Sequence, residues 1–137
     1  MSGRAGDAGL VSTADDLFAF SRLMLQRGVS RDGQRLVSEA SVAAMTHDHL
    51  TTSQRGGGAP ILLGRGWGYG LSVCLERSPE GVPSGAFGWN GGLGTSWVTD
   101  PAEDLTLILL TQQAFTSHVP PAINRDFWTT AYQALDD

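Results

Sequence analysis

The sequence predicts an α+β fold, in which an antiparallel sheet of three to four strands is flanked by helices. Apolar residues at helical spacing open the chain, and short runs rich in aromatic and branched residues fill its second half. Helical spacing then returns after a double proline. The chain has 137 residues and no shift in composition, so we expect one domain over residues 1–137.

Two helices are predicted at the start of the chain. Ser12-Thr13 precedes Asp15-Asp16, and hydroxyl caps followed by acids are typical of a helix N-terminus. Leu17, Phe20, Leu23 and Met24 share one face, and Arg27-Gly28 indicates the end of this helix. Ser38 can cap a shorter helix that runs through Met45.

The segment from Thr51 to Gly66 is predicted to be a mobile loop, because it is rich in Gly, Ser and Thr and has no periodicity. The strands are expected after it, at Trp67 to Leu75, Ala86 to Trp89, Thr95 to Thr99 and Leu105 to Gln112.

Tight connections are expected at Asn90-Gly91-Gly92 and at Asp100 to Asp104, so the last strands form a meander. After Pro120-Pro121, a final helix is predicted from Ala122 to Leu135. Its apolar face would contain Ile123, Phe127, Ala131 and Leu135.

Composition excludes several functions. The net charge of −5 has no basic cluster, which argues against a nucleic-acid partner. No apolar run is long enough to cross a membrane, and residues 1–6 lack the apolar core of a signal peptide, so a cytoplasmic location is the expectation. Cys74 cannot form an internal disulfide and is expected to be buried.

All nine basic residues are arginine, and the chain contains no lysine. A Walker phosphate loop, a Schiff-base enzyme and a serine–lysine pair all require lysine, so this chain alone can form none of them. The glycines in Gly66-Trp-Gly-Tyr-Gly70 also fail the dinucleotide-binding pattern, and no cofactor is expected.

Several stretches occur in an order that resembles the C-terminal half of the serine-β-lactamase-like hydrolases, which include class C β-lactamases, D-alanyl-D-alanine carboxypeptidases and related esterases. They are Gly9-Leu-Val-Ser-Thr-Ala-Asp-Asp16, Leu36-Val-Ser-Glu39, Gly66-Trp-Gly-Tyr-Gly-Leu71 and Gly88-Trp-Asn-Gly-Gly-Leu-Gly-Thr95 with Asp100-Pro101. The resemblance implies a single incomplete domain, the C-terminal portion of that fold.

In that family, catalysis uses a Ser-x-x-Lys element, a Tyr-x-Asn or similar element and a Lys-Thr-Gly-like triplet. The resemblance implies that Trp89, Asn90 and Gly91 replace the triplet in a Trp-x-Gly form and bind substrate. It also implies that the backbone amide of Gly92 is one donor of the oxyanion hole, which stabilises the negative charge that develops during acyl transfer. A tryptophan in place of the cationic lysine favours neutral esters or amides.

The other catalytic elements have no counterpart. Neither Tyr69-Gly-Leu nor Tyr132-Gln-Ala matches the tyrosine element. We therefore expect the chain alone to be inactive, although the parent family consists of serine hydrolases. The alternative is a non-catalytic interaction domain, which pairs through an exposed sheet edge with another copy or with a separate N-terminal half.

Other polar and aromatic residues have plainer interpretations. His47 and His49 lack a third ligand, so a polar helix end is favoured over a metal site, and no metal is expected. His118 is interpreted as a loop residue, because no Gly-x-Ser-x-Gly sequence accompanies it. Trp67, Tyr69 and Trp97 could border an acyl pocket, but a role in the core is favoured. Asn90-Gly91-Gly92 by itself also fits a simple hairpin turn.

Overall fold

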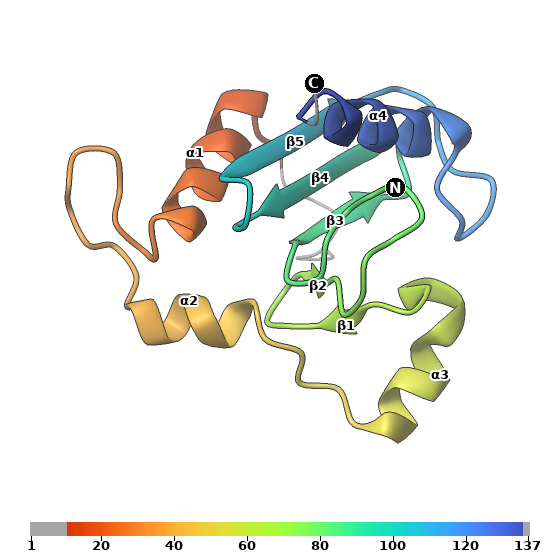
Figure 1. The fold of residues 1–137 in the computed structure, drawn as a ribbon, viewed down its shortest axis with the longest axis horizontal. Coiled ribbons are helices and arrows are strands. Elements are labelled where there is room, and N and C mark those ends of the chain that lie inside the picture. Colours follow the sequence, from red (N-terminus) through yellow and green to blue (C-terminus); the bar gives the residue numbers. More distant parts are fainter. Residues whose placement is uncertain (1–10, 136–137) are drawn as a thin grey trace.

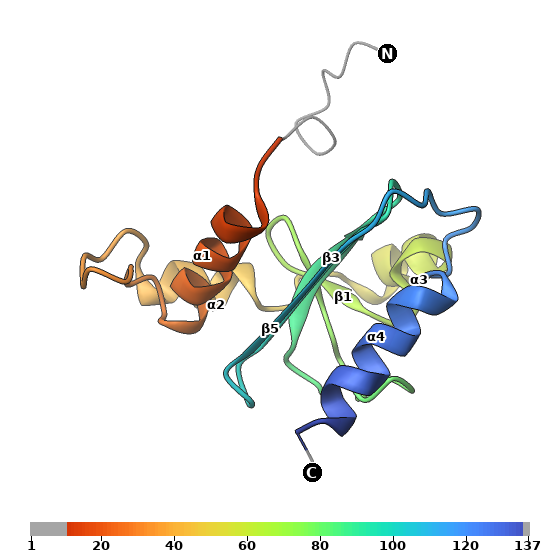
Figure 2. The same ribbon diagram turned by 90° about the horizontal axis from the view of Figure 1, so that it is seen from above.

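A five-stranded antiparallel sheet separates the helices into two layers in the computed structural model, which describes residues 11–135 (Figure 1). The strands follow chain order and are β1 (Gly66–Trp67), β2 (Ser72–Val73), β3 (Phe87–Gly91), β4 (Thr95–Asp100) and β5 (Leu105–Leu110). Helices α1 (Ala14–Leu25) and α2 (Glu39–Met45) lie on one side of the sheet, and α3 (Thr52–Leu62) and α4 (Ala122–Gln133) lie on the other (Figure 2). The α+β prediction is confirmed.

The sheet has more strands than the expected three to four, because the stretch from Trp67 to Leu75 is not one strand. It folds back into the short hairpin of β1 and β2, in which Gly66 pairs with Val73. The glycines explain the turn: Gly70 has a positive φ of 85°, and the amide of Gly68 donates to the carbonyl of Leu71.

Helix α1 begins as predicted. The Thr13 hydroxyl accepts from the amide of Asp16, and the helix ends before Arg27 and Gly28, both of which have positive φ. The predicted face is only partly buried, because Phe20 remains 37% exposed. Ser21, which was not predicted to lie on the buried face, is fully buried.

The loop prediction for Thr51 to Gly66 is wrong, because α3 occupies most of this segment. Thr51 and Gln54 form a reciprocal capping box at its N-terminus, in which each side chain accepts from the other residue's backbone amide. Leu62 is buried near its C-terminal end. Capping and this apolar contact offset the low helix propensity of Gly56, Gly57 and Gly58.

The first meander turn lies later than predicted. Strand β3 continues through Gly91, which pairs with Thr95, so the turn consists of residues 92–94. The second connection is as predicted, since Asp100 pairs with Leu105.

Helix α4 follows the double proline as predicted, and Phe127 and Ala131 of the predicted face pack, partly buried, against the core. Asn124, Trp128 and Tyr132 are its buried residues, whereas Ile123 and Leu135 are nearly half exposed. The sheet accepts the larger aromatic side chains in place of the aliphatic ends of the expected face.

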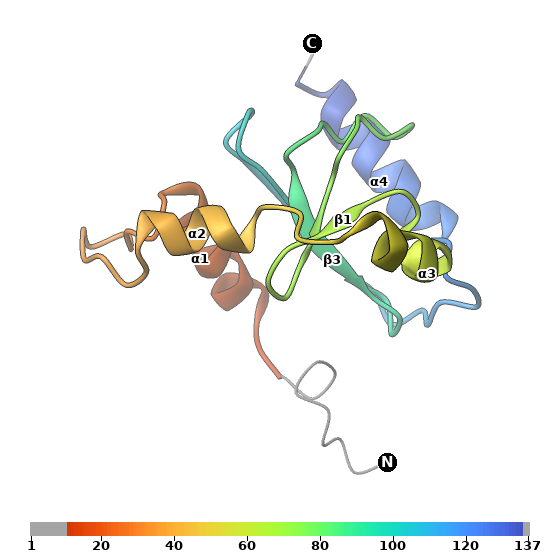
Figure 3. The ribbon, with the colours of Figure 1, turned by 90° about the horizontal axis from the view of Figure 1, so that it is seen from below.

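Two apolar clusters of side chains hold the layers together, one on each side of the sheet. Figure 3 shows the helices of the two layers, α1 and α2 on one side and α3 and α4 on the other. On the α4 side, Cys74, Val82, Val98 and Leu107 are among the residues that pack with Trp128 and Tyr132. On the other side, Met24 of α1 and Val42 of α2 pack with Leu71, Val73 and Phe87. Burial of Cys74 is confirmed. Among residues 11–135, no helix combines the length and apolar character that a membrane crossing requires.

Candidate functional site

A cavity of about 850 Å³ lies beside the turn that follows β3. Its walls come from the C-terminal end of α3, residues 74–82, the end of β3, residues 115–120 and the first turns of α4. We call it the β3–α4 cavity. Trp89, Asn90 and Gly92, three of the four residues predicted to meet substrate, contribute to its wall. The fourth, Gly91, is not part of that wall and pairs with Thr95.

The indole of Trp89 is held by a second tryptophan. Trp67 of β1 meets it edge-on, with ring centroids 4.6 Å apart and an interplanar angle of 86°. Such an edge-to-face pair restrains both rings. Trp89 is half-buried, so it presents a neutral aromatic surface to the cavity.

Asn90 and Gly91 are fixed by strand β4. The amide oxygen of Asn90 accepts a 2.8 Å hydrogen bond from the hydroxyl of Ser96, which is buried. At Gly91, a Cβ atom would collide with the Thr95 hydroxyl, so the Thr95 side chain would have to turn away to admit a larger residue.

Gly92 offers an unused backbone donor. Its carbonyl accepts a 2.8 Å hydrogen bond from the amide of Phe115, which fixes the orientation of the peptide. Within residues 11–135, its own N–H has no backbone carbonyl partner, and no atom lies within 4 Å of the position that a Cβ would occupy. A restrained glycine with an unpaired amide on the wall of a cavity can donate to an oxyanion.

Arg65, which directly precedes β1, also lines the cavity. One of its terminal nitrogens donates to Ser72 Oγ at 3.1 Å, and the other donates to Cys74 Sγ at 2.7 Å. Cys74 is 3% exposed, so its thiol is an inward-facing anchor for the guanidinium rather than an accessible nucleophile.

His47 and His49 take part in local packing. His49 stacks on Tyr69 with centroids 4.4 Å apart, and its Nε2 lies 2.7 Å from the Ala44 carbonyl oxygen. Within the described ranges, no three His, Cys, Asp or Glu side chains gather closely enough to hold a metal ion.

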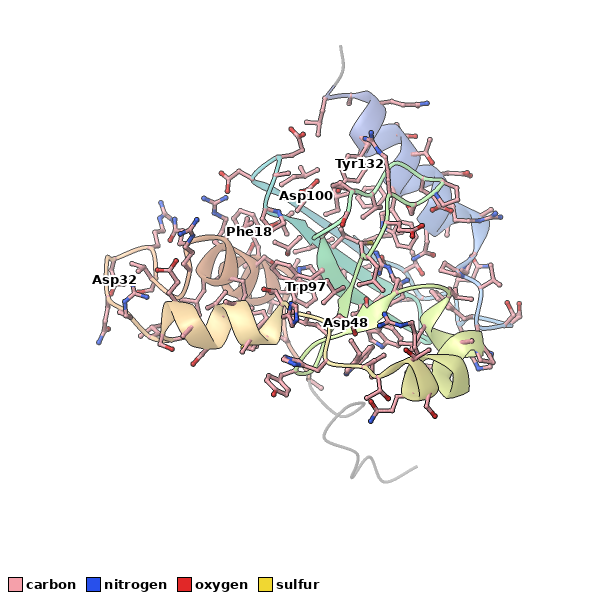
Figure 4. The ribbon with its side chains drawn as sticks, turned by 60° about the horizontal axis from the view of Figure 1, so that its bottom comes forward. Phe18, Asp32, Asp48, Trp97, Asp100 and Tyr132 are labelled. Carbon is pink, nitrogen blue, oxygen red and sulfur yellow. The ribbon has the colours of Figure 1, made fainter. Side chains whose placement is uncertain are left out.

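Asp48, between these histidines, joins α2 to β1 and α3 (Figure 4). Its carboxylate accepts from the amides of Trp67 and Leu50 and pairs with Arg55 at 2.7 Å. Burial alone would raise the pKa of Asp48, but these partners outweigh it and hold the pKa below the ordinary value.

The other aromatic residues considered for the site lie in different environments. Trp97 packs against the α1 side of the core, as favoured, and its indole N–H donates to Ser21 Oγ at 2.6 Å. Tyr69 is 61% exposed, so the expectation that it fills the core is wrong. Trp67 is half-buried against Trp89. His118 is an exposed loop residue as predicted, but its loop contributes to the cavity wall.

Tyr132 is buried in the apolar core on the α4 side of the sheet. Its hydroxyl donates to Asp100 at 3.0 Å, and burial together with this carboxylate raises its pKa (Figure 4). Residues that sequence reasoning missed are Arg65, Trp128 and the 115–120 loop, which meet the cavity only through long-range packing. No local pattern signals them.

Comparison with known proteins gives a consistent result. The family model described as Beta-lactamase matches residues 1–126. Two curated relatives from Mycobacterium tuberculosis, Protein Rv1367c of strain H37Rv and Uncharacterized protein MT1414 of strain CDC 1551, are each 42% identical over 114 residues. These alignments cover 76% of the chain but only 28% of each relative, so the chain spans less than a third of their length.

Solved structures share the fold. A β-lactamase, Mb2281c, from Mycobacterium bovis has a TM-score of 0.63 and 25% identity, with 90% of this chain and 43% of that chain covered. Simvastatin synthase (LovD) from Aspergillus terreus has a TM-score of 0.63 and 19% identity, with 85% and 32% covered.

Proposed function

Because the chain belongs to the β-lactamase family, we propose that it forms the Trp-x-Gly wall of a serine hydrolase active site and supplies one oxyanion donor. Trp89 and Asn90 would contact the substrate, Gly91 would hold β3 against β4 beside them, and the Gly92 amide would donate to the developing oxyanion. One observation carries the proposal. The Gly92 N–H is unpaired within residues 11–135, its peptide is restrained by Phe115, and it borders the cavity that Trp89 and Asn90 also line.

The nucleophile must come from outside these 137 residues, because a Ser-x-x-Lys element requires a lysine and the chain has none. In the proposed reaction, that serine attacks an ester or amide carbonyl and its lysine accepts the serine proton. The carbonyl oxygen becomes negative and is held by the Gly92 N–H together with the amide of the serine. The intermediate then collapses to an acyl-serine, and the departing alcohol or amine takes the proton from the lysine. Water hydrolyses the acyl-serine, which releases the acid and restores the serine hydroxyl.

The neutral surface of Trp89 supports an ester or amide that is uncharged at the reacting group. A lysine at this position would offer a cation to a β-lactam carboxylate, whereas an indole cannot.

The test uses a chromogenic short-acyl ester, offered to the chain alone and to the chain mixed with a Ser-x-x-Lys-containing N-terminal half of the family. We expect hydrolysis only in the mixture. Gly92→Pro removes the N–H and should lower kcat by roughly a hundred- to a thousandfold, the usual cost of one oxyanion donor. Gly92→Ala keeps that donor and should retain most of the activity.

Hydrolysis by the chain alone would contradict the proposed division of the active site. Equal activity of Gly92→Pro and Gly92→Ala would remove Gly92 from it.

A second function, pairing with another chain, is supported by strand β5. It pairs with β4 on one edge only, and its other edge has no partner among the described strands. Its residues are mostly apolar, and Leu110 is 55% exposed. An unpaired apolar edge invites another strand, either from an N-terminal half or from a second copy. Light scattering of the purified chain tests self-association, and a monomer at high concentration would count against the second copy.

A further inference from the structure

The β3–α4 cavity has an excess of hydrogen-bond donors. Arg65, Arg77 and Arg125 contribute to its wall, and no carboxylate among residues 11–135 lies within ion-pairing distance of these three arginines. By contrast, Arg22, Arg27 and Arg55 each pair with an acid. Arg65 donates to Ser72 and Cys74, and Arg77 Nε donates to the Gly81 carbonyl at 3.2 Å. Guanidinium groups only donate, so their remaining N–H groups can be satisfied by water or by an acceptor that enters the cavity.

Two buried donors on the same wall also lack partners. Trp128 is 6% exposed, and its indole N–H has no acceptor within the part of the chain that the structure describes. The same is true of the buried hydroxyl of Ser78. Buried polar groups in native proteins nearly always have a partner, so each of these orphaned groups beside a cavity calls for one. An indole N–H is donor-only, so its missing partner is an acceptor.

The N-terminus of α4 adds further unpaired donors and positive potential beside the cavity. Its cap residue, Pro121, provides no side-chain hydrogen bond, and the first turn contains no acid. The backbone amides of Ala122 and Ile123 have no partner among the described residues, and the positive dipole end of the helix lies close to Arg125.

We infer that the β3–α4 cavity binds the carboxylate of an organic monoanion with an apolar body. Arg125, Arg77 and the free donors of Arg65 would hold the carboxylate together with the Trp128 N–H. Apolar wall residues such as Leu62, Val82 and Phe115 would cover the remainder of the molecule.

Charge on the same wall favours a monoanion over a phosphate. Glu76 and Glu80 also line the cavity, and neither pairs with its arginines. Two carboxylates on the cavity wall disfavour a dianion more strongly than a singly charged group. The cavity wall has three arginines and two glutamates, so its net charge of about +1 is balanced by one carboxylate.

This inference deepens the proposed function and rests on it in one respect, namely that the carboxylate belongs to the substrate. Trp89 provides no cation at the reacting group, so the arginines would supply charge recognition elsewhere in the cavity. The substrate class becomes an ester or amide that carries a carboxylate away from its reacting carbonyl.

Calorimetric titration of the chain tests the inference without catalysis. Hexanoate is compared with hexanamide, its uncharged isostere, and inorganic phosphate is a third ligand. We expect hexanoate to bind about tenfold more tightly than hexanamide, the order expected for one charge-assisted hydrogen bond, and phosphate to bind more weakly than hexanoate.

Arg125 is exposed and has no side-chain partner among the described residues, so Arg125→Gln should leave the fold intact, which circular dichroism checks. It should remove most of the preference for hexanoate. The matched control is Arg31→Gln, which removes the same charge at an exposed site outside the β3–α4 cavity and should leave the preference unchanged. Arg77→Gln provides a second variant within the cavity.

Equal binding of hexanoate and hexanamide, or no binding of either, would overturn the inference. So would tighter binding of phosphate, or an equal loss in Arg31→Gln and Arg125→Gln. Failure of the ester assay with hexanoate preference intact would instead remove the catalytic proposal and leave the carboxylate site.

Discussion

The Tyr132 hydroxyl donates a 3.0 Å hydrogen bond to Asp100, and both residues are more than nine-tenths buried. This bond joins α4 to the end of β4, the strand that pairs with β3 along its whole length. The second Asp100 oxygen accepts from the amide of Ala102 and shapes the turn into β5. A single carboxylate therefore connects the C-terminal helix to the sheet that carries Trp89 and Asn90.

Tyr132→Phe should destabilise the chain by about 1–3 kcal/mol, because the buried carboxylate loses a donor that water cannot replace. Urea unfolding followed by circular dichroism measures the loss. Tyr69→Phe is the matched control, since Tyr69 is 61% exposed, and it should change stability by no more than about 0.5 kcal/mol. Similar losses in the two variants would show that the bond to Asp100 contributes little.

The contact between Trp97 and Ser21 predicts a coupling between α1 and β4. Trp97 donates to the Ser21 hydroxyl, which itself donates to the Leu17 carbonyl at 2.9 Å. Trp97→Phe and Ser21→Ala should each destabilise the fold, and the double variant should lose about 1 kcal/mol less than the sum. Strict additivity in a double-mutant cycle would mean that this hydrogen bond contributes nothing measurable.

Elements with local signals were predictable from the sequence. The Thr13 cap, the loop from Asp100 to Leu105 and the strands on either side of it depend on residues a few positions apart. For the same reason the glycines after Trp89 could be recognised as a tight turn, although strand pairing extends β3 to Gly91 and moves the turn to residues 92–94.

Long-range packing decided the features that were missed. A loop was predicted from the run of three glycines at residues 56–58, yet the Thr51 cap and the burial of Leu62 stabilise a helix there. In α4, apolar spacing indicated one face, but the sheet buries Trp128 on a neighbouring face. The β3–α4 cavity could not be predicted from the sequence for the same reason, because its arginines come from separate parts of the chain.

Asp48 predicts a pH dependence with a definite sign. Its folded-state pKa lies below the ordinary value of 3.8, so its contribution to stability is complete above that value and is lost as the pH falls through the folded-state pKa. Asp48→Asn should therefore lower stability by about 1 kcal/mol near neutral pH and by less in acid.

Urea unfolding at neutral and acid pH measures this difference. Asp126→Asn is the control, because Asp126 is exposed and has no side-chain partner among the described residues, so it should show little change at either pH. An Asp48→Asn deficit that grows as the pH falls would contradict the predicted sign.

Two glycines near Trp89, Gly88 and Gly92, should differ strongly in the stability that each loses on substitution by alanine. A Cβ at Gly88 would collide with the carbonyl oxygen of Trp97, and the residue has a φ of 153°. Gly88→Ala should therefore push β3 and β4 apart and destabilise the chain by roughly 2–4 kcal/mol, in the range of severe overpacking and backbone strain.

Gly92→Ala tests whether an added side chain destabilises the chain at every glycine in this stretch or only where β3 and β4 are in contact. A Cβ at Gly92 meets no atom within 4 Å, so Gly92→Ala should change stability by less than about 1 kcal/mol. Thermal unfolding of both variants gives the comparison. If Gly92→Ala were as destabilising as Gly88→Ala, the space beside the Gly92 Cα would not be open, which would contradict the steric difference between the two glycines.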